Sequence, residues 1–165
     1  MQIEFSKYQG TGNDFILIDN RQGQCDNLSQ SDIQCYCDRR FGIGADGLIL
    51  IQLSVDSAFE MVYFNADGSQ SMCGNGARCS VAFAKFLGII EQKTNFLAID
   101  GDHQAVIADE LIELEMRPVL SLANAGQDYF VNTGSPHHVR FVENVGDYPV
   151  FEEGKKIRYS NEYAP

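Results

Sequence analysis

Cys73 stands directly before a Gly-Asn-Gly turn, in the stretch MCGNGARC that covers residues 72–79. The almost wholly apolar segment after it predicts a helix over residues 77–87 that is buried nearly all round. The free N–H groups at the start of such a helix suit an anion such as a carboxylate. The same positive end favours the thiolate form of a cysteine, which acts as a base or a nucleophile. The alternative is that Cys73 is a small buried apolar side chain.

Two more kinds of side chain could take part in chemistry near this thiol. His137 and His138 follow the turn NTGSP, and alternation along a strand sends them to opposite faces. We expect one of them to influence a nearby thiol and the other to face solvent. Cys79 lies one and a half turns into the helix, where we expect it to serve packing.

Two further motifs resemble ligand sites but lack the required context. GIGADG at residues 42–47 matches the spacing of a dinucleotide fingerprint, yet a helix precedes it and a strand follows it, the reverse of that motif. Cys35 and Cys37 have no second Cys/His pair at zinc-site spacing, so no metal site is predicted. The five cysteines are odd in number and irregularly spaced, which indicates reduced thiols.

These residues must be positioned by many short strands and few helices. A helix over residues 29–40 is expected to begin at a Ser/Asp cap and to hold its cysteines at least half-buried. Alternating or short apolar runs predict strands at residues 2–8, 15–19, 48–53, 59–64, 95–100, 104–108, 111–116, 128–134 and 137–145. Pro118 interrupts this pattern. No further element is predicted beyond Val145. The pattern predicts an α+β fold with mostly antiparallel sheet and a domain boundary near Arg117.

Composition limits the classes of partner. The 165 residues include 23 acidic and 12 basic side chains, a formal charge of -11, which repels phosphate backbones and anionic lipid surfaces. No apolar run reaches the roughly 18 residues of a membrane span, and the N-terminus lacks the pattern of a signal peptide. We therefore expect no nucleic-acid partner, no membrane partner and a cytoplasmic location.

The set FSKYQGTGNDF, FNADGS, MCGNGARC and NTGSPH, in this order, resembles the diaminopimelate epimerase family. The resemblance implies a lobe of antiparallel strands wrapped around a central buried helix. It implies an isomerase without metal or cofactor, which converts LL- to meso-diaminopimelate by two-cysteine, two-base proton transfer. It also implies a homodimer when full length, a small amino acid as substrate, and a place in lysine and peptidoglycan precursor biosynthesis.

The resemblance also implies roles for individual residues. Cys73 matches the first catalytic cysteine of the family, and His137 matches a histidine that adjusts the acidity of that cysteine. The positions that match substrate-binding residues are Asn13, Asn65, Gly74 and Asn75.

Two positions depart from the family pattern. Gly47 stands where the family often has glutamine and offers only backbone. Ser135 stands where the family has asparagine, and we expect it to donate a hydrogen bond to substrate over a shorter reach.

The resemblance implies that residues 1–117 form the first epimerase lobe and that residues 118–165 begin an incomplete second lobe. In the family the second half carries the partner cysteine, so these 165 residues alone are predicted to be inactive. Two alternatives remain: a related isomerase of the proline racemase or phenazine-biosynthesis type, and a non-catalytic amino-acid-binding module.

Overall fold

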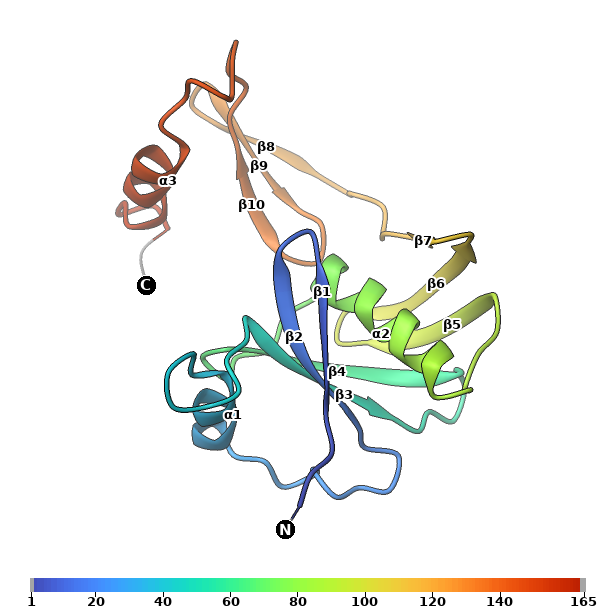
Figure 1. Cartoon of the computed structure of the whole chain (residues 1–165). Coiled ribbons are helices and arrows are strands. Elements are labelled where there is room, and N and C mark those ends of the chain that lie inside the picture. The colour runs from blue at the N-terminus through green and yellow to red at the C-terminus, as the bar shows by residue number, and fades with distance from the viewer. Residues whose placement is uncertain (1, 164–165) are drawn as a thin grey trace.

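The computed structural model describes residues 2–163 and has an α+β fold (Figure 1). Within these residues there are a larger sheet of seven strands, a smaller sheet of three, and three helices. No helix in the described range combines the length and apolar content that crossing a membrane requires.

Seven strands form the larger sheet and three form the smaller one, and the strands and the helices are each numbered in chain order. The larger sheet contains β1 (Ser6–Gly10), β2 (Asn13–Asp19), β3 (Gly47–Gln52), β4 (Phe59–Asn65), β5 (Lys93–Ala98), β6 (Gly101–Ala108) and β7 (Leu111–Leu114). The smaller sheet contains β8 (Leu122–Ala125), β9 (Asp128–Asn132) and β10 (Pro136–Val139). The helices are α1 (Gln30–Cys37), α2 (Gly74–Phe86) and α3 (Val150–Arg158).

The larger sheet curls around α2. Its strands lie in sequence order from β1 to β7, yet α2 contacts both β1 and β7 as well as strands between them. A sheet whose two outer strands touch one helix must bend around that helix, as Figure 1 shows. The predicted arrangement of strands around a central helix is therefore confirmed.

Helix α2 is central because its sequence is apolar and small on most sides. Ala77, Val81, Phe83 and Ala84 are buried in a core with side chains from the concave face of the sheet. The burial is less complete than predicted at the end of the helix, where Phe86 is 74% exposed.

The predicted antiparallel character holds for most strand pairs, but two pairs are parallel. β2 pairs in parallel with β3, and β4 pairs in parallel with β5. Parallel neighbours need a crossover, and the segments that contain α1 and α2 supply the two crossovers. Because helices then cover both faces, β2 is buried on both sides, with Phe15 in the core of α2 and Ile16 in that of α1.

Helix α1 begins where the sequence predicts. Ser29 and Asp32 form a reciprocal capping box in which each side chain accepts from the other residue's backbone N–H. The helix ends at Cys37, three residues before the predicted end. Cys37 is buried, but Cys35 is exposed, so the expectation that both thiols are at least half-buried is wrong for Cys35.

The largest differences from the sequence prediction lie after Arg117. The strand expected over residues 137–145 ends at Val139, and β8 and α3 were not predicted. Helix α3 buries none of its residues, and its nine residues include only three large apolar side chains, Val150, Phe151 and Ile157. Its charges instead suit the helix dipole, with acidic residues in the first turn and basic residues in the last.

Candidate functional site

A pocket of about 320 Å³ opens at the N-terminus of α2. Residues from four separate parts of the chain line it, and they are Asn13, Met72, Cys73, Gly74, Asn75, Met116, Thr133, Ser135 and His137. Six of the seven predicted site residues therefore lie around one pocket. The seventh, Asn65, does not line it.

Cys73 is the N-cap of α2. Its backbone is extended, and its Sγ accepts a hydrogen bond from the N–H of Gly76 at 3.4 Å. The N–H of Ala77 bonds the carbonyl of Cys73 at 2.8 Å, which closes the first helical turn. Within residues 2–163 this leaves the N–H groups of Gly74 and Asn75 without a hydrogen-bond partner. A half-buried thiol and two free helix amides thus lie side by side, an arrangement suited to an anion.

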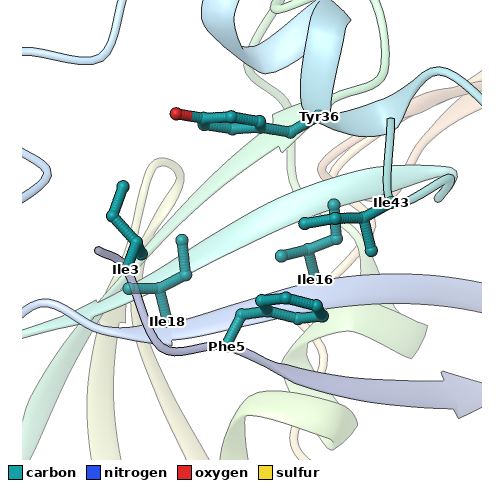
Figure 2. A pocket seen from close by; sticks show the side chains of 6 residues that line it. All are labelled: Ile3, Phe5, Ile16, Ile18, Tyr36 and Ile43. Carbon is teal, nitrogen blue, oxygen red and sulfur yellow. The ribbon is translucent and has the colours of Figure 1, made fainter. Parts of the chain in front are cut away.

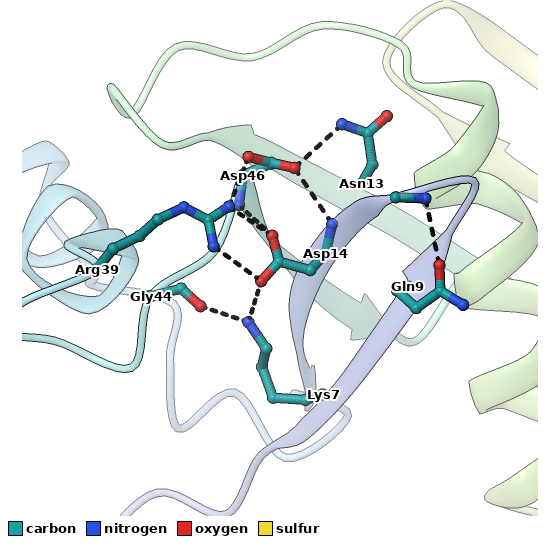
Figure 3. A network of polar contacts seen from close by, with 8 residues as sticks. Lys7, Gln9, Asn13, Asp14, Arg39, Gly44 and Asp46 are labelled. Carbon is teal, nitrogen blue, oxygen red and sulfur yellow. Dashed lines mark hydrogen bonds and ion pairs between the residues drawn. The ribbon is translucent and has the colours of Figure 1, made fainter.

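Asn13 reaches the pocket from the tip of the β1–β2 hairpin. The two residues of the turn, Thr11 and Gly12, both have positive φ angles of 51° and 92°, as the two-residue turn with the twist of a hairpin requires. The Oδ1 atom of Asn13 accepts from the Nδ2 of Asn75 at 2.8 Å. Its own Nδ2 donates to Asp46 at 3.1 Å, which joins the pocket to the charged network in Figure 3.

Ser135 and His137 reach the pocket from the turn between β9 and β10. The Ser135 hydroxyl donates to the backbone carbonyl of Met72 at 2.7 Å. The single proton of this hydroxyl is used in that bond, so Ser135 would have to exchange its partner to donate to a substrate, and that expectation stays a prediction. His137 is exposed, and its Nε2 lies 3.0 Å from the Oγ1 of Thr133.

The neighbouring histidine does not face solvent as expected. The Nε2 of His138 lies 2.9 Å from a carboxylate oxygen of Asp128, and its Nδ1 lies 3.1 Å from the hydroxyl of Tyr163. Arg140 shares the same carboxylate at 2.7 Å. The hydrogen bonds from Arg140 and His138 lower the pKa of Asp128 to about 2. His138 therefore joins β10 to β9 within the smaller sheet, and His137 is the histidine that lines the pocket.

Asn65 is held within its own turn. Its Oδ1 accepts from the hydroxyl of Tyr63 at 2.9 Å, and its Nδ2 bonds Ser69 and Ser71 at 3.1 and 3.2 Å. The ring of Tyr63 also explains why Gly47 carries no side chain. A Cβ atom at residue 47 would lie 2.4 Å from a ring carbon of Tyr63 and 2.5 Å from the carbonyl oxygen of Phe64.

Cys79 packs in the core, as predicted for it. It is 4% exposed, and burial followed by the nearby thiol of Cys73 raises its pKa to about 11. A thiol that stays protonated through the physiological range is a poor base.

A second hollow, of about 220 Å³, lies between the first strands and α1 (Figure 2). It is lined by Ile3, Phe5, Ile16, Ile18, Tyr36 and Ile43. Apart from the hydroxyl of Tyr36 these side chains are hydrocarbon, so this hollow lacks the combination of a thiol and free N–H groups found at the start of α2.

The sequence prediction missed three residues that line the pocket, Met72, Met116 and Thr133, and it missed Asp46, which bonds the pocket residue Asn13 from outside. Thr133 lies within the NTGSPH motif, so the sequence did contain a signal for this residue. Asp46 lies within GIGADG, a motif considered only as a dinucleotide fingerprint. Met116 reaches the pocket from the segment after β7, and nothing in its local sequence indicates that position.

Several known proteins resemble this chain in sequence. The family profile described as diaminopimelate epimerase matches residues 5–116. A diaminopimelate epimerase from Flavobacterium psychrophilum is 55% identical over 98% of this chain, and one from Chlorobaculum tepidum is 44% identical over 94% of it. The chain spans 64% of the length of each of these two relatives.

Solved structures share the fold at low sequence identity. A hydroxyproline epimerase from Agrobacterium vitis matches 92% of this chain and 57% of its own, with a TM-score of 0.61 at 11% identity. A phenazine biosynthesis protein of the PhzF family from Bacillus anthracis matches 84% of this chain and 55% of its own, with a TM-score of 0.59 at 13% identity. The α+β fold is thus shared with these two solved structures, and from the family profile and the identities to its relatives the chain belongs to the diaminopimelate epimerase family.

Proposed function

We propose that the protein is an epimerase that interconverts LL- and meso-diaminopimelate by moving the proton on one α-carbon. The observation that carries this proposal is the pocket at the start of α2, where the Cys73 thiol adjoins the free N–H groups of Gly74 and Asn75. A substrate carboxylate bound to these two amides places the adjacent α-carbon next to the thiol.

The α-proton of an amino acid is only weakly acidic, so charge that develops on the carboxylate must be stabilised. Fixed N–H donors at a helix terminus supply that stabilisation without reorganisation, and the proposal needs no cofactor. In the proposed step, the thiolate of Cys73 takes the proton from the α-carbon, and the electron pair left behind delocalises into the carboxylate. His137 is proposed to adjust the acidity of that thiol from its place in the same pocket.

Inversion needs a second acid that delivers a proton to the opposite face of the carbon. Of the cysteines in residues 2–163, only Cys73 lines the pocket. Cys79 is buried, lies about 9 Å further along the helix axis by the rise of six residues, and has a raised pKa. We therefore propose a two-cysteine mechanism whose second thiol is not among these 165 residues, and we expect the chain alone to be inactive.

The proposal extends to the whole protein as the family resemblance implies. Residues 1–117 correspond to a first lobe and residues 118–165 to the start of a second. The full-length protein is proposed to be a cytoplasmic homodimer in lysine and peptidoglycan precursor biosynthesis, where thiols stay reduced. Asn65 and Ser135 stay proposed substrate contacts, and both would have to exchange their present hydrogen bonds to act as such.

The decisive test is exchange of the α-proton of diaminopimelate with deuterated water, measured on the product of the complete gene. Wild-type protein should incorporate deuterium and interconvert the two isomers. Cys73→Ser should lose both, whereas Cys35→Ser, which changes an exposed thiol of α1, should retain both. Absence of exchange in the wild type rejects the proposal, and exchange with proline instead would favour a racemase of related fold.

A second test separates a reactive thiol from an inert binding site. The rate of Cys73 alkylation is measured against pH, with the exposed Cys35 as the internal reference. Under the proposal, Cys73 reacts faster than Cys35 at neutral pH and is protected by diaminopimelate. Equal rates and pH profiles for the two thiols would favour a non-catalytic binding module.

A further inference from the structure

A network of charged side chains is hydrogen-bonded to Asn13, a residue of the pocket wall (Figure 3). Arg39 bonds Asp14 at 2.6 Å and Asp46 at 2.7 Å, and Lys7 bonds Asp14 at 2.7 Å and the carbonyl of Gly44. None of the four charged residues lines the pocket. The connection to the pocket runs from Asp46 to Asn13.

We propose that Asp46 is a positioning residue that fixes the side-chain amides of Asn13 and Asn75 in the orientation that recognises the substrate. This inference rests on the proposed function, because it concerns the same pocket and the same amino-acid substrate.

The orientation follows from which atoms can donate. An ionised carboxylate only accepts hydrogen bonds, so Asp46 requires Asn13 to present its NH₂ group, which lies 3.1 Å from the Oδ2 of Asp46. The Oδ1 of Asn13 then points to the other side and accepts from the Nδ2 of Asn75 at 2.8 Å. One carboxylate therefore determines how two amides in the pocket are turned.

Asp46 is itself held firmly in place and in its ionised form. Its Oδ1 accepts from Arg39, and its Oδ2 also accepts from the backbone N–H of Asp14 at 3.2 Å. Its own backbone N–H bonds the carbonyl of Asp14 at 2.9 Å. The hydrogen bond from Asn13, followed by that from Arg39, lowers the pKa of Asp46.

The result is a defined polar pattern at the pocket wall. Each of the two amides keeps one N–H for which residues 2–163 supply no acceptor, and the Oδ1 of Asn75 receives no hydrogen bond from them. An amino acid carries an acceptor carboxylate and a donor ammonium group, so it complements both kinds of atom. If either amide were free to rotate, donors and acceptors would exchange places, and part of this match would be lost.

The test compares Asp46→Asn and Asp46→Ala with the wild type, in the product of the complete gene. The amide introduced by D46N keeps an acceptor oxygen but also offers an NH₂ group, so KM for diaminopimelate should rise by about 3-fold in D46N and by about 10-fold or more in D46A. The kcat of D46N should change by less than about 2-fold, because no reacting group has been altered.

Asp19→Asn is the matched control. Asp19 is paired with Arg21 at 2.7 Å and has a side-chain exposure of 34%, close to the 39% of Asp46, but it is not part of the pocket. A purely structural effect would lower the melting temperature in both variants and leave KM unchanged in both.

The second readout is the side-chain NH₂ resonances of Asn13 and Asn75 in a ¹⁵N-labelled sample. D46N should shift both pairs, and D19N should shift neither. An unchanged Asn75 pair, or an unchanged KM in a D46N protein that is otherwise active, overturns the inference. Absence of activity towards diaminopimelate in the wild-type protein would instead reject the proposed function. The NH₂ resonances of Asn13 and Asn75 would still test the role of Asp46 in that case.

Discussion

The absence of a side chain at Gly47 leads to a quantitative prediction about packing beside the pocket. A Cβ atom there would lie 2.4 Å from Tyr63 Cε2, 2.5 Å from the Phe64 carbonyl oxygen and 2.9 Å from the Tyr63 hydroxyl. Ordinary contacts between such atoms are about 3.5–4.0 Å, so the overlap is about 1 Å. The Phe64 carbonyl belongs to the strand paired with residue 47 and cannot retreat without breaking the pairing.

Gly47→Ala should therefore destabilise the protein strongly. Overpacking of a dense core typically costs about 1–3 kcal/mol, and the backbone contact places this substitution near about 3 kcal/mol. For a protein of this size, that corresponds to a fall in melting temperature of about 6–12 °C. Gly47→Gln should be at least as damaging, and it should not add a substrate contact, since Tyr63 occupies the space that its side chain would enter.

The assay is thermal and urea unfolding followed by circular dichroism. Gly154→Ala is the control, because a Cβ atom at this helical position meets no atom within 4 Å and should stabilise by about 0.5–1 kcal/mol. In a Tyr63→Ala background, Gly47→Ala should cost clearly less than in the wild type, because two of the three close atoms are removed. A shift below about 2 °C for the single variant, or the same cost in both backgrounds, would refute the reasoning.

Three further predictions concern stability and pH. Ser29→Ala removes one half of the capping box with Asp32 and should cost about 1 kcal/mol in urea unfolding, whereas Ser29→Asp should retain most of it. The pKa of Cys79 is raised from 9.0 to about 11, so the contribution of this thiol to stability is complete below pH 9 and is lost as the pH rises to 11. Cys79→Ala should therefore flatten the dependence of unfolding free energy on pH in that range. The pKa of Asp128 is lowered from 3.8 to about 2, mainly by its hydrogen bond with Arg140, so the contribution of this carboxylate to stability is present above pH 3.8 and is lost on acidification. Asp128→Asn should therefore reduce the slope of acid unfolding between about pH 4 and 2.

The parts of the fold that could be predicted are those whose cause is local in sequence. The cap of α1 depends on two residues three positions apart, Ser29 and Asp32. The apolar run after Cys73 identified α2 because a helix that is apolar on most sides is expected to be buried. The meander of β5, β6 and β7 follows from short turns between adjacent strands.

The parts that could not be predicted depend on distant residues. Phe15 lies beside Gly47 in a parallel pair, and single-sequence periodicity does not report which strands become neighbours. The bond between Asn13 and Asp46 joins residues 33 positions apart. The exposure of Cys35 depends on which face α1 turns to the sheet. The same limit applies to Ser135, whose proton is taken by a carbonyl 63 residues away.

That last hydrogen bond also links the smaller sheet to the segment that precedes α2. The Ser135 hydroxyl belongs to the loop of the smaller sheet, and the carbonyl it holds belongs to Met72, the residue before the thiol. Any hinge movement that swings the smaller sheet away from α2 must either break this bond or pull on the backbone that carries Cys73. The position of the Cys73 thiol is thus coupled to that of the smaller sheet through this hydrogen bond.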